Sequence, residues 1–294
     1  MKIAPDLAAR LAREGLPGRY ADTITGVWTP LAAEISALRR RLGRPVLVGI
    51  NGVQGSGKST ACLFLERLLG VHGLSAATLS LDDLYHSKAQ RARLAATVHP
   101  LFATRGVPGT HDVALGQRTI AALLTGSGPV IVPRFDKGRD APATTWPTVI
   151  APVDVLLFEG WCIGATPQQE STLESPVNAL ESREDPDLTW RRAVNDALGG
   201  DYARLFAPID LLVALLAPDF GVVSAWRRQQ ERPLRAQGLG MDDAALDRFI
   251  QHFERLSRHM LATMPGRADV IVPIAQDHTA GAVQWRDRPA VDRC

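Results

Sequence analysis

The sequence predicts an α/β fold in which a doubly wound, mainly parallel sheet is flanked by helices, with a helical extension at the N-terminus. Short apolar runs rich in valine, leucine and isoleucine alternate with segments whose apolar residues recur at helical spacing. Several of these runs end at a polar cluster, as strands of an open parallel sheet do where ligands bind beyond their carboxyl ends. A glycine-rich loop joins the first run to the helix that follows it. This alternation is typical of a sheet covered by helices on both faces.

Length and composition set the limits of the interpretation. The 294 residues suffice for one large α/β domain or two small ones. A formal net charge of +2 argues against nucleic acid or a membrane surface as a partner, and the longest apolar run, 211–217, is far shorter than the roughly 20 residues that cross a bilayer. The cysteines Cys62, Cys162 and Cys294 have no metal-ligand spacing and cannot all pair. With no apparent signal peptide, we expect a cytoplasmic protein, and the composition sets no oligomeric state.

The chain is expected to consist of three parts. Apolar periodicity predicts helices over 5–14 and 20–42, which we expect to serve packing, and a glycine and a proline then end the helical stretch. The three parts are 1–44, the N-terminal helical extension; 45–276, the α/β domain that carries the site; and 277–294, the C-terminal tail.

The most informative stretch is a glycine loop between the apolar segment 45–50 and a helix over 61–69. It matches the pattern G-x-x-x-x-G-K-[ST], in which backbone N–H groups face a polyphosphate at a helix N-terminus. Lys58 can reach the β- and γ-phosphates, and the Ser59 hydroxyl can ligate Mg²⁺. A plain turn between strand and helix is the alternative, which the loop, lysine, hydroxyl and flanking segments together argue against. The residues expected to bind the nucleotide are Gly52, Gln54, Gly55, Ser56, Gly57, Lys58, Ser59 and Thr60.

The second predicted strand, 75–81, delivers Asp82 and Asp83 at its carboxyl end, with Tyr85 close behind. In a parallel sheet this end faces the glycine loop. Two adjacent carboxylates there can supply a general base, a water-mediated Mg²⁺ ligand, or one of each. The alternative is an ordinary helix N-cap, since aspartate is favoured in that position.

Two further stretches carry cations toward the same edge. Residues 98–112 form a long glycine- and proline-rich loop with Arg105 and His111, which we interpret as a lid or substrate loop, or else as a solvated connector. A predicted third strand, 128–133, leads to Arg134 and Lys137, which can hold an anionic substrate or belong to a solvated turn. Helices are predicted over 87–98, short and exposed, and over 112–125, and a loop over 142–147.

The predicted strand 153–161 contains Glu159 after an apolar run, as in the Walker B pattern, where the carboxylate faces Mg²⁺ and its waters. A surface glutamate after a buried strand is the alternative. Residues 165–187 are predicted to be a mobile excursion, and a helix over 220–237, interrupted by Pro233, places a row of arginines near one face. The row consists of Arg228, Arg232 and Arg235. It can neutralise the negative charge of a phosphoryl group during its transfer, or it can be a solvated basic face. The remaining predictions are helices over 188–198 and 242–264 and strands over 209–216 and 268–274.

Taken together, these motifs resemble the glycerate kinase family of plants and fungi and its bacterial relatives. This family lies within the wider P-loop NTPase-type group of phosphoribulokinase, uridine kinase and bacterial pantothenate kinase. The resemblance covers about residues 45–275, with Leu84 standing where an aromatic residue is common and His99 where asparagine is expected before proline. The motifs that carry it are 52–60, Ser80–Tyr85, Arg105–Asp112, Pro133–Lys137, Phe158–Trp161 and Trp226–Arg227 leading to 240–243.

The resemblance implies phosphoryl transfer from ATP, with Mg²⁺, to a small hydroxy acid, most simply D-glycerate. Asp82 matches the catalytic base of the wider group and Glu159 its Walker B acid. We expect Lys58 and Arg227 to complete the catalytic set and Ser59 and Glu159 to hold the metal. The residues expected on the acceptor side are Asp83, Tyr85, Arg105, His111, Arg134 and Lys137. A kinase for another acceptor, such as a nucleoside or a pantothenate-like acid, and a nucleotide-sensing module without turnover are the alternatives.

Overall fold

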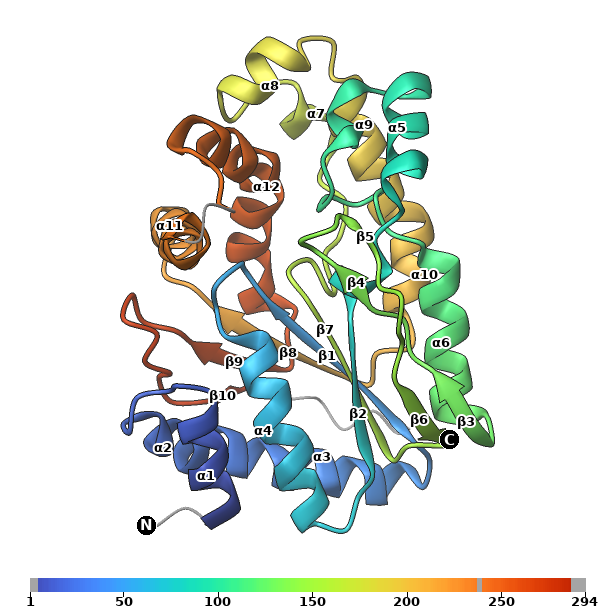
Figure 1. The fold of residues 1–294 in the computed structure, drawn as a ribbon, viewed down its shortest axis with the longest axis vertical. Coiled ribbons are helices and arrows are strands. Elements are labelled where there is room, and N and C mark those ends of the chain that lie inside the picture. Colours follow the sequence, from blue (N-terminus) through green and yellow to red (C-terminus); the bar gives the residue numbers. More distant parts are fainter. Residues whose placement is uncertain (1–4, 237–239, 287–294) are drawn as a thin grey trace.

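A central six-stranded sheet organises the computed structural model, which describes residues 5–236 and 240–286 (Figure 1). Its strands are β1 (Val46–Gly52), β2 (Ala76–Ser80), β7 (Val155–Gly160), β8 (Leu211–Leu216), β9 (Val270–Pro273) and β10 (Gln284–Trp285). Their order is β10-β9-β8-β1-β7-β2, and every neighbouring pair is parallel except β9 and β10, which are antiparallel. The predicted doubly wound, mainly parallel sheet is confirmed.

The register of the sheet brings its functional ends together. Ile50 of β1 pairs with Glu159 of β7, and on the other side of β7 Glu159 pairs with Ser80 of β2. Parallel pairing makes all three strands end at the same edge. Because the P-loop follows β1 and Asp82 follows β2, both must lie beside Glu159.

Helices cover both faces of the sheet. They are α1 (Pro5–Arg13), α2 (Tyr20–Thr23), α3 (Thr29–Leu42), α4 (Lys58–Val71), α5 (Lys88–Thr97), α6 (Val113–Thr125), α7 (Glu170–Leu173), α8 (Ala179–Glu184), α9 (Thr189–Ala197), α10 (Ala203–Phe206), α11 (Phe220–Ala236) and α12 (Asp243–Thr263). On one face α3 and α4 pack against alternate residues of β1, such as Val48, and on the other α6 and α10 pack against residues such as Leu47. Both faces of the parallel strands are therefore buried, as this class of sheet requires.

The N-terminal extension shares the first of these cores. A π-helical turn, Ile24–Trp28, joins α2 to α3, so the predicted helix over 20–42 is essentially continuous. Leu31 and Ile35 are fully buried against α4 and β1, whereas Leu42, the last residue of α3, is 39% exposed. The extension is therefore built into the body of the α/β domain rather than appended to it.

The expected third strand, 128–133, is not part of the main sheet. Instead, β3 (Gly128–Ile131) pairs antiparallel with β6 (Thr148–Ala151), a strand that the sequence did not predict. Ile131 and Ile150 stay 63% and 69% exposed, which shows a sheet covered on one face only. A second small hairpin, β4 (Phe135–Asp136) with β5 (Ala141–Pro142), was also missed.

The segment 165–187 is ordered, so its prediction as a mobile excursion is wrong. It contains α7 and α8, which gather with α9 and α5 at the end of the molecule far from the N-terminus (Figure 1). Arg255 of α12 donates to the carbonyls of Thr172 and Ser175 and pairs with the buried Glu181. Buried charged side chains whose hydrogen-bonding groups all have partners hold this segment in place. The composition of the segment does not show that such pairs form.

Two helix predictions also need correction. Helix α11 runs without a break to Ala236, so the interruption expected at Pro233 is wrong, and its last expected residue, Gln237, lies outside the described residues. Helix α5 is not simply exposed, because Arg91 is 1% exposed and pairs with Asp140 of the β4–β5 hairpin. No helix among the described residues is long and apolar enough to cross a membrane.

Candidate active site

The P-loop connects β1 to α4 in the expected way. Gly55 and Gly57 have φ values of 84° and 88°, which favour glycine. A Cβ on Gly55 would also lie 2.7 Å from the Cβ of Trp226, so the loop passes closely beneath α11. Lys58 begins α4 and its Nζ donates to the carbonyl of Val53 at 3.2 Å. The loop thus already has the curvature that a phosphate cradle needs.

A serine and a glutamate mark the position where a metal ion fits. The Ser59 hydroxyl donates to Oε1 of Glu159 at 3.0 Å, and Glu159 is only 6% exposed. Two hard oxygen donors next to a phosphate cradle are the ligand type that Mg²⁺ prefers. These residues therefore fit the metal expected beside a P-loop.

The two aspartates after β2 have different partners. They lie in a 3₁₀ turn, Leu81–Leu84, that follows directly from the strand. Asp82 accepts a hydrogen bond from the Tyr85 hydroxyl at 2.8 Å and pairs with Nζ of Lys137 at 2.5 Å. Asp83 accepts from the backbone N–H of Phe135 at 3.0 Å and pairs with Arg134 at 3.3 Å. Asp83 therefore anchors β4 of the β4–β5 hairpin. Asp82 faces the cavity and is paired there with Lys137.

The environment pushes the pKa values of these two carboxyls apart. Burial alone would raise the pKa of Asp82, but the charge and hydrogen bond of Lys137, with the Tyr85 hydrogen bond, more than offset it and lower the pKa to about 2. Burial dominates at Asp83 and raises its pKa despite the Phe135 and Arg134 contacts. Neighbouring acids with separated pKa values are a common arrangement in active sites.

A cavity of about 1280 Å³ joins the P-loop to these acids. One end is lined by the P-loop, Asp82, Asp83, Glu159 and the two cations of the hairpin, Arg134 and Lys137. The other end extends well beyond the phosphate cradle. The residues that line this second end include Tyr20, Thr23, Val27, Trp28, Gln229, Gln230, Gln276, His278 and Ala280.

The second end was missed by the sequence reasoning. The extension, expected to serve packing, contributes 16–28 to its wall, and the expected tail contributes 277–282. Trp226 supports that wall, since its indole N–H donates to the Gln276 carbonyl at 2.8 Å and its ring stacks on His278. No local pattern marks these residues, because they meet only when both ends of the chain pack onto α11 and the P-loop.

Five expected site residues do not line the cavity in the described part of the chain: Gly52, which ends β1 ahead of the loop, and Tyr85, Arg105, His111 and Arg227. Tyr85 is 7% exposed and lies behind Asp82, with its ring stacked on His111. His111 is 3% exposed, contacts the Tyr202 hydroxyl, and has its pKa lowered to about 3 by burial. Arg105 pairs with Asp140 beneath the β4–β5 hairpin. These three support the acceptor side from behind rather than face it.

Arg227, the last of the five, packs toward α12 and does not line the cavity. It pairs with the buried Glu231 at 2.7 Å and packs over the ring of Phe249 in α12. Two members of the expected arginine row likewise pair with acids of α12: Arg228 with Asp247, and Arg235 with Asp243 at 2.7 Å. In this arrangement these arginines join the two helices.

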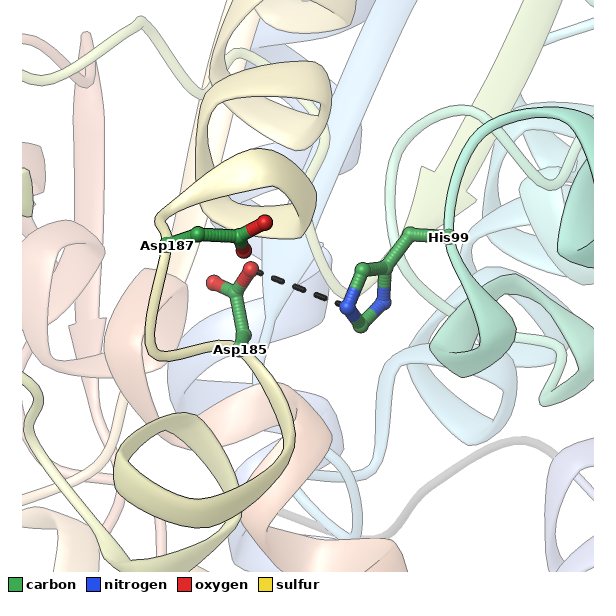
Figure 2. A group of neighbouring side chains, drawn as sticks. All are labelled: His99, Asp185 and Asp187. Carbon is green, nitrogen blue, oxygen red and sulfur yellow. Dashed lines mark ion pairs between the residues drawn. The ribbon is translucent and has the colours of Figure 1, made fainter.

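A second polar cluster lies away from the cavity, where His99 approaches Asp185 and Asp187 (Figure 2). His99 Nε2 is 3.9 Å from Oδ1 of Asp185. The fully buried Asp185 already accepts from the N–H of Trp190 and from both the N–H and Nε of Arg191. A divalent cation there would face the Arg191 guanidinium, so the cluster is a packing contact between α9 and the turn after α5.

The fold and the cavity together define the class. A P-loop, a Walker B acid paired with the P-loop serine, and a second strand-end acid beside two cations share one cavity on a doubly wound sheet. This is the constellation of a P-loop kinase, in which a phosphate cradle faces an acceptor site across a metal position.

Comparisons with known proteins agree with this class. No protein-family model matches the chain. It is 34% identical over 223 residues to a fission yeast (Schizosaccharomyces pombe) protein described as the uncharacterized kinase mug58, covering 72% of this chain and 79% of that protein. It is 32% identical over 232 residues to the chloroplastic D-glycerate 3-kinase of Arabidopsis thaliana, covering 75% of this chain and about half, 48%, of that enzyme.

A solved structure supports the fold. The D-glycerate 3-kinase of Cryptococcus neoformans superposes with a TM-score of 0.72 at 24% identity, covering 88% of this chain and 97% of that one. With the sequence matches above, the chain belongs to the glycerate kinase family of P-loop kinases, which are phosphotransferases.

Proposed function

We propose that the protein transfers the γ-phosphoryl group of MgATP to a hydroxyl of a small hydroxy acid, with D-glycerate, giving 3-phosphoglycerate, as the first candidate acceptor. The observation that carries this proposal is the position of Asp82, with Arg134 and Lys137, in the same cavity as the P-loop and Glu159. An acid and two cations opposite a phosphate cradle suit an acceptor that carries both a hydroxyl and a carboxylate.

On the nucleotide side, the P-loop N–H groups and Lys58 would hold the β- and γ-phosphates. Ser59 and Glu159 would hold Mg²⁺, which neutralises charge that develops on the phosphates. The far end of the cavity, formed by 16–28 and 274–282, has the room and the mixed apolar and polar lining for the base and ribose.

On the acceptor side, Asp82 would take the proton of the attacking hydroxyl. Arg134 and Lys137 would bind the acceptor carboxylate, with Arg134 able to pair in a bidentate way. Asp83, Tyr85, Arg105 and His111 would act by supporting these three. Burial and the Asp82 charge raise the pKa of Tyr85, so it stays a hydrogen-bond donor to the base.

Arg227 would serve the phosphates only after it leaves Glu231. Closure of the site around the phosphates is the step that would do this, and it would also exclude water from the γ-phosphate. Without such a movement, Arg227 is a link between α11 and α12.

The decisive experiment measures ADP release with and without D-glycerate and identifies the product by ³¹P and ¹³C NMR. Stimulated release with phosphate on the 3-hydroxyl is expected. If only a nucleoside or a pantothenate-like acid stimulates ADP release, that compound is the acceptor instead of D-glycerate. Tight ATP binding with no acceptor-stimulated ADP release would favour a nucleotide sensor. The cytoplasmic location stays a prediction, since the Arabidopsis relative is chloroplastic.

A further inference from the structure

Both oxygens of the proposed base already have partners. Nζ of Lys137 lies 2.5 Å from Oδ2 of Asp82, and the Tyr85 hydroxyl donates to Oδ1 at 2.8 Å. A carboxylate that pairs with an ammonium group and accepts a second hydrogen bond has a low affinity for a further proton. In this state Asp82 is a poor acceptor for the proton of an attacking hydroxyl.

The side chain of Lys137 can move while its backbone stays in place. Its side chain is 58% exposed, so little packing holds the flexible stem. Its carbonyl, in contrast, accepts a hydrogen bond from Arg105, which also pairs with Asp140 later in the same hairpin. The start of the hairpin is fixed by the bond from the Phe135 N–H to Asp83. The ammonium group can therefore be exchanged between partners without rearranging the hairpin.

Asp83 and Arg134, next to Asp82, form an ion pair with each other, and three further groups around Asp82 are neutral. Burial lowers the pKa of His111 to about 3, and burial raises the pKa values of Tyr85 and Cys162, so none of the three carries a charge at neutral pH. Among the groups that lower the pKa of Asp82, Lys137 makes the largest contribution. The state of the base thus depends mainly on where the Lys137 ammonium group lies.

We propose that Lys137 restrains Asp82 until an anionic acceptor takes its ammonium group. The acceptor carboxylate pairs with Lys137, and Asp82, released from the ion pair, takes the proton of the acceptor hydroxyl. The acceptor oxygen then bonds to the γ-phosphorus as the bond to the β–γ bridging oxygen breaks and ADP leaves. This inference rests on the proposed function and deepens it: the acceptor must be an anion, and water, which carries no carboxylate, leaves the base restrained.

The first test compares acceptor-free ADP release in wild type and Lys137→Met, with Lys88→Met, an exposed lysine on α5, as the control. The Met variant is expected to release ADP several-fold faster than wild type without acceptor, and its kcat/KM for D-glycerate is expected to fall. Its preference for D-glycerate over glycerol, which has the hydroxyls but no carboxylate, should shrink. The control should match wild type, and unchanged acceptor-free release in Lys137→Met would overturn the proposal.

The second test needs no turnover. With a non-hydrolysable ATP analogue bound, Asp82→Asn is expected to bind D-glycerate more tightly than wild type, because the competitor for Lys137 is gone. In a Lys137→Met background the same substitution should bring no gain, since a double-mutant cycle isolates the contribution of the pair. A gain of the same size in both backgrounds would show simple charge repulsion by Asp82 and overturn the proposal.

The two tests separate this inference from the proposed function. If D-glycerate neither binds nor stimulates wild type, the proposed acceptor is wrong, yet faster acceptor-free release in Lys137→Met still supports the restraint. If wild type phosphorylates D-glycerate and neither expected change occurs, the proposed function stands and the restraint does not.

Discussion

The hydroxyl of Ser59 lies 3.0 Å from the carboxylate of Glu159, across 100 residues of sequence. The first residue belongs to the first turn of α4 and the second to the end of β7. Two oxygen donors meet here because parallel strands end together and the P-loop turns back over their edge. This contact fixes where a metal ion would enter the reaction.

Glu159→Gln should separate nucleotide binding from metal binding. The amide keeps the shape and the Ser59 contact but removes the negative charge that a dication needs. In thermal denaturation, MgATP is expected to raise the Tm of wild type more than ATP with EDTA does, whereas the two additions should act equally on the variant. Glu184→Gln, at a surface pair with Arg248, is the matched control. A full Mg²⁺ effect in Glu159→Gln would contradict the metal assignment.

Asp82→Asn should abolish turnover and spare the nucleotide. An amide cannot accept the proton of the acceptor hydroxyl, so kcat is expected to fall by about 10²–10⁴-fold, the usual contribution of a general base. The Kd for ATP, measured by calorimetry, should stay close to that of wild type. Asp201→Asn, at an exposed pair with Arg204, controls for loss of an aspartate. Wild-type kcat in Asp82→Asn would remove the base from the mechanism.

The buried pair of Asp185 and Arg191 should matter far more to stability than a surface pair nearby. Both side chains are nearly inaccessible, and Asp185→Asn leaves the guanidinium with an incomplete set of partners. The free energy of unfolding is expected to fall by about 3–5 kcal/mol in urea denaturation. Arg192→Ala, which breaks the exposed pair with Glu170, should cost less than about 1 kcal/mol. Equal effects of the two substitutions would contradict this view of the segment.

His252 should make the fold sensitive to acid. Burial lowers the pKa of this histidine to about 4, so between an unfolded value of about 6.5 and that pKa the unfolded chain binds the extra proton. Stability is therefore fully present above pH 6.5 and falls by up to about 1.4 kcal/mol per pH unit as the pH drops through this window. His252→Phe, which keeps a ring against Trp190, should make that part of the pH profile less steep in urea denaturation, while His111 continues to contribute to the slope. An unchanged slope would assign the acid sensitivity to other groups.

The sequence was most informative where function and fold share a local pattern. The P-loop, the acids after two strands and the strand character of the apolar runs before them follow from local spacing, because each is encoded within about ten residues. Asp82 and Glu159 could therefore be expected near the P-loop before the sheet was seen. The β3–β6 ladder was not predicted, because β6 is a short run with one exposed face and was assigned to no element.

Local patterns do not predict the far end of the cavity, nor do they show that several side chains expected to bind ligands pair with other protein groups instead. Arg105, His111 and Arg227 were expected to face ligands, but Asp140, Tyr202 and Glu231 hold them elsewhere. The sequence does not show which group a charged side chain pairs with. An arginine that spacing predicts to bind a substrate can instead pair with an acid that lies elsewhere in the chain. Tyr20 and His278 lie at opposite ends of the chain and had no motif to connect them.

One indole ties together the two ends of the nucleotide cavity. Trp226 lies against Gly55 of the P-loop while holding the carbonyl of Gln276 and the ring of His278. Because Trp226 contacts both the P-loop and the opposite wall of the cavity, we expect a movement of either one to move the other. Adenosine alone and pyrophosphate alone should therefore each bind far more weakly than expected from the part of the intact nucleotide that each represents.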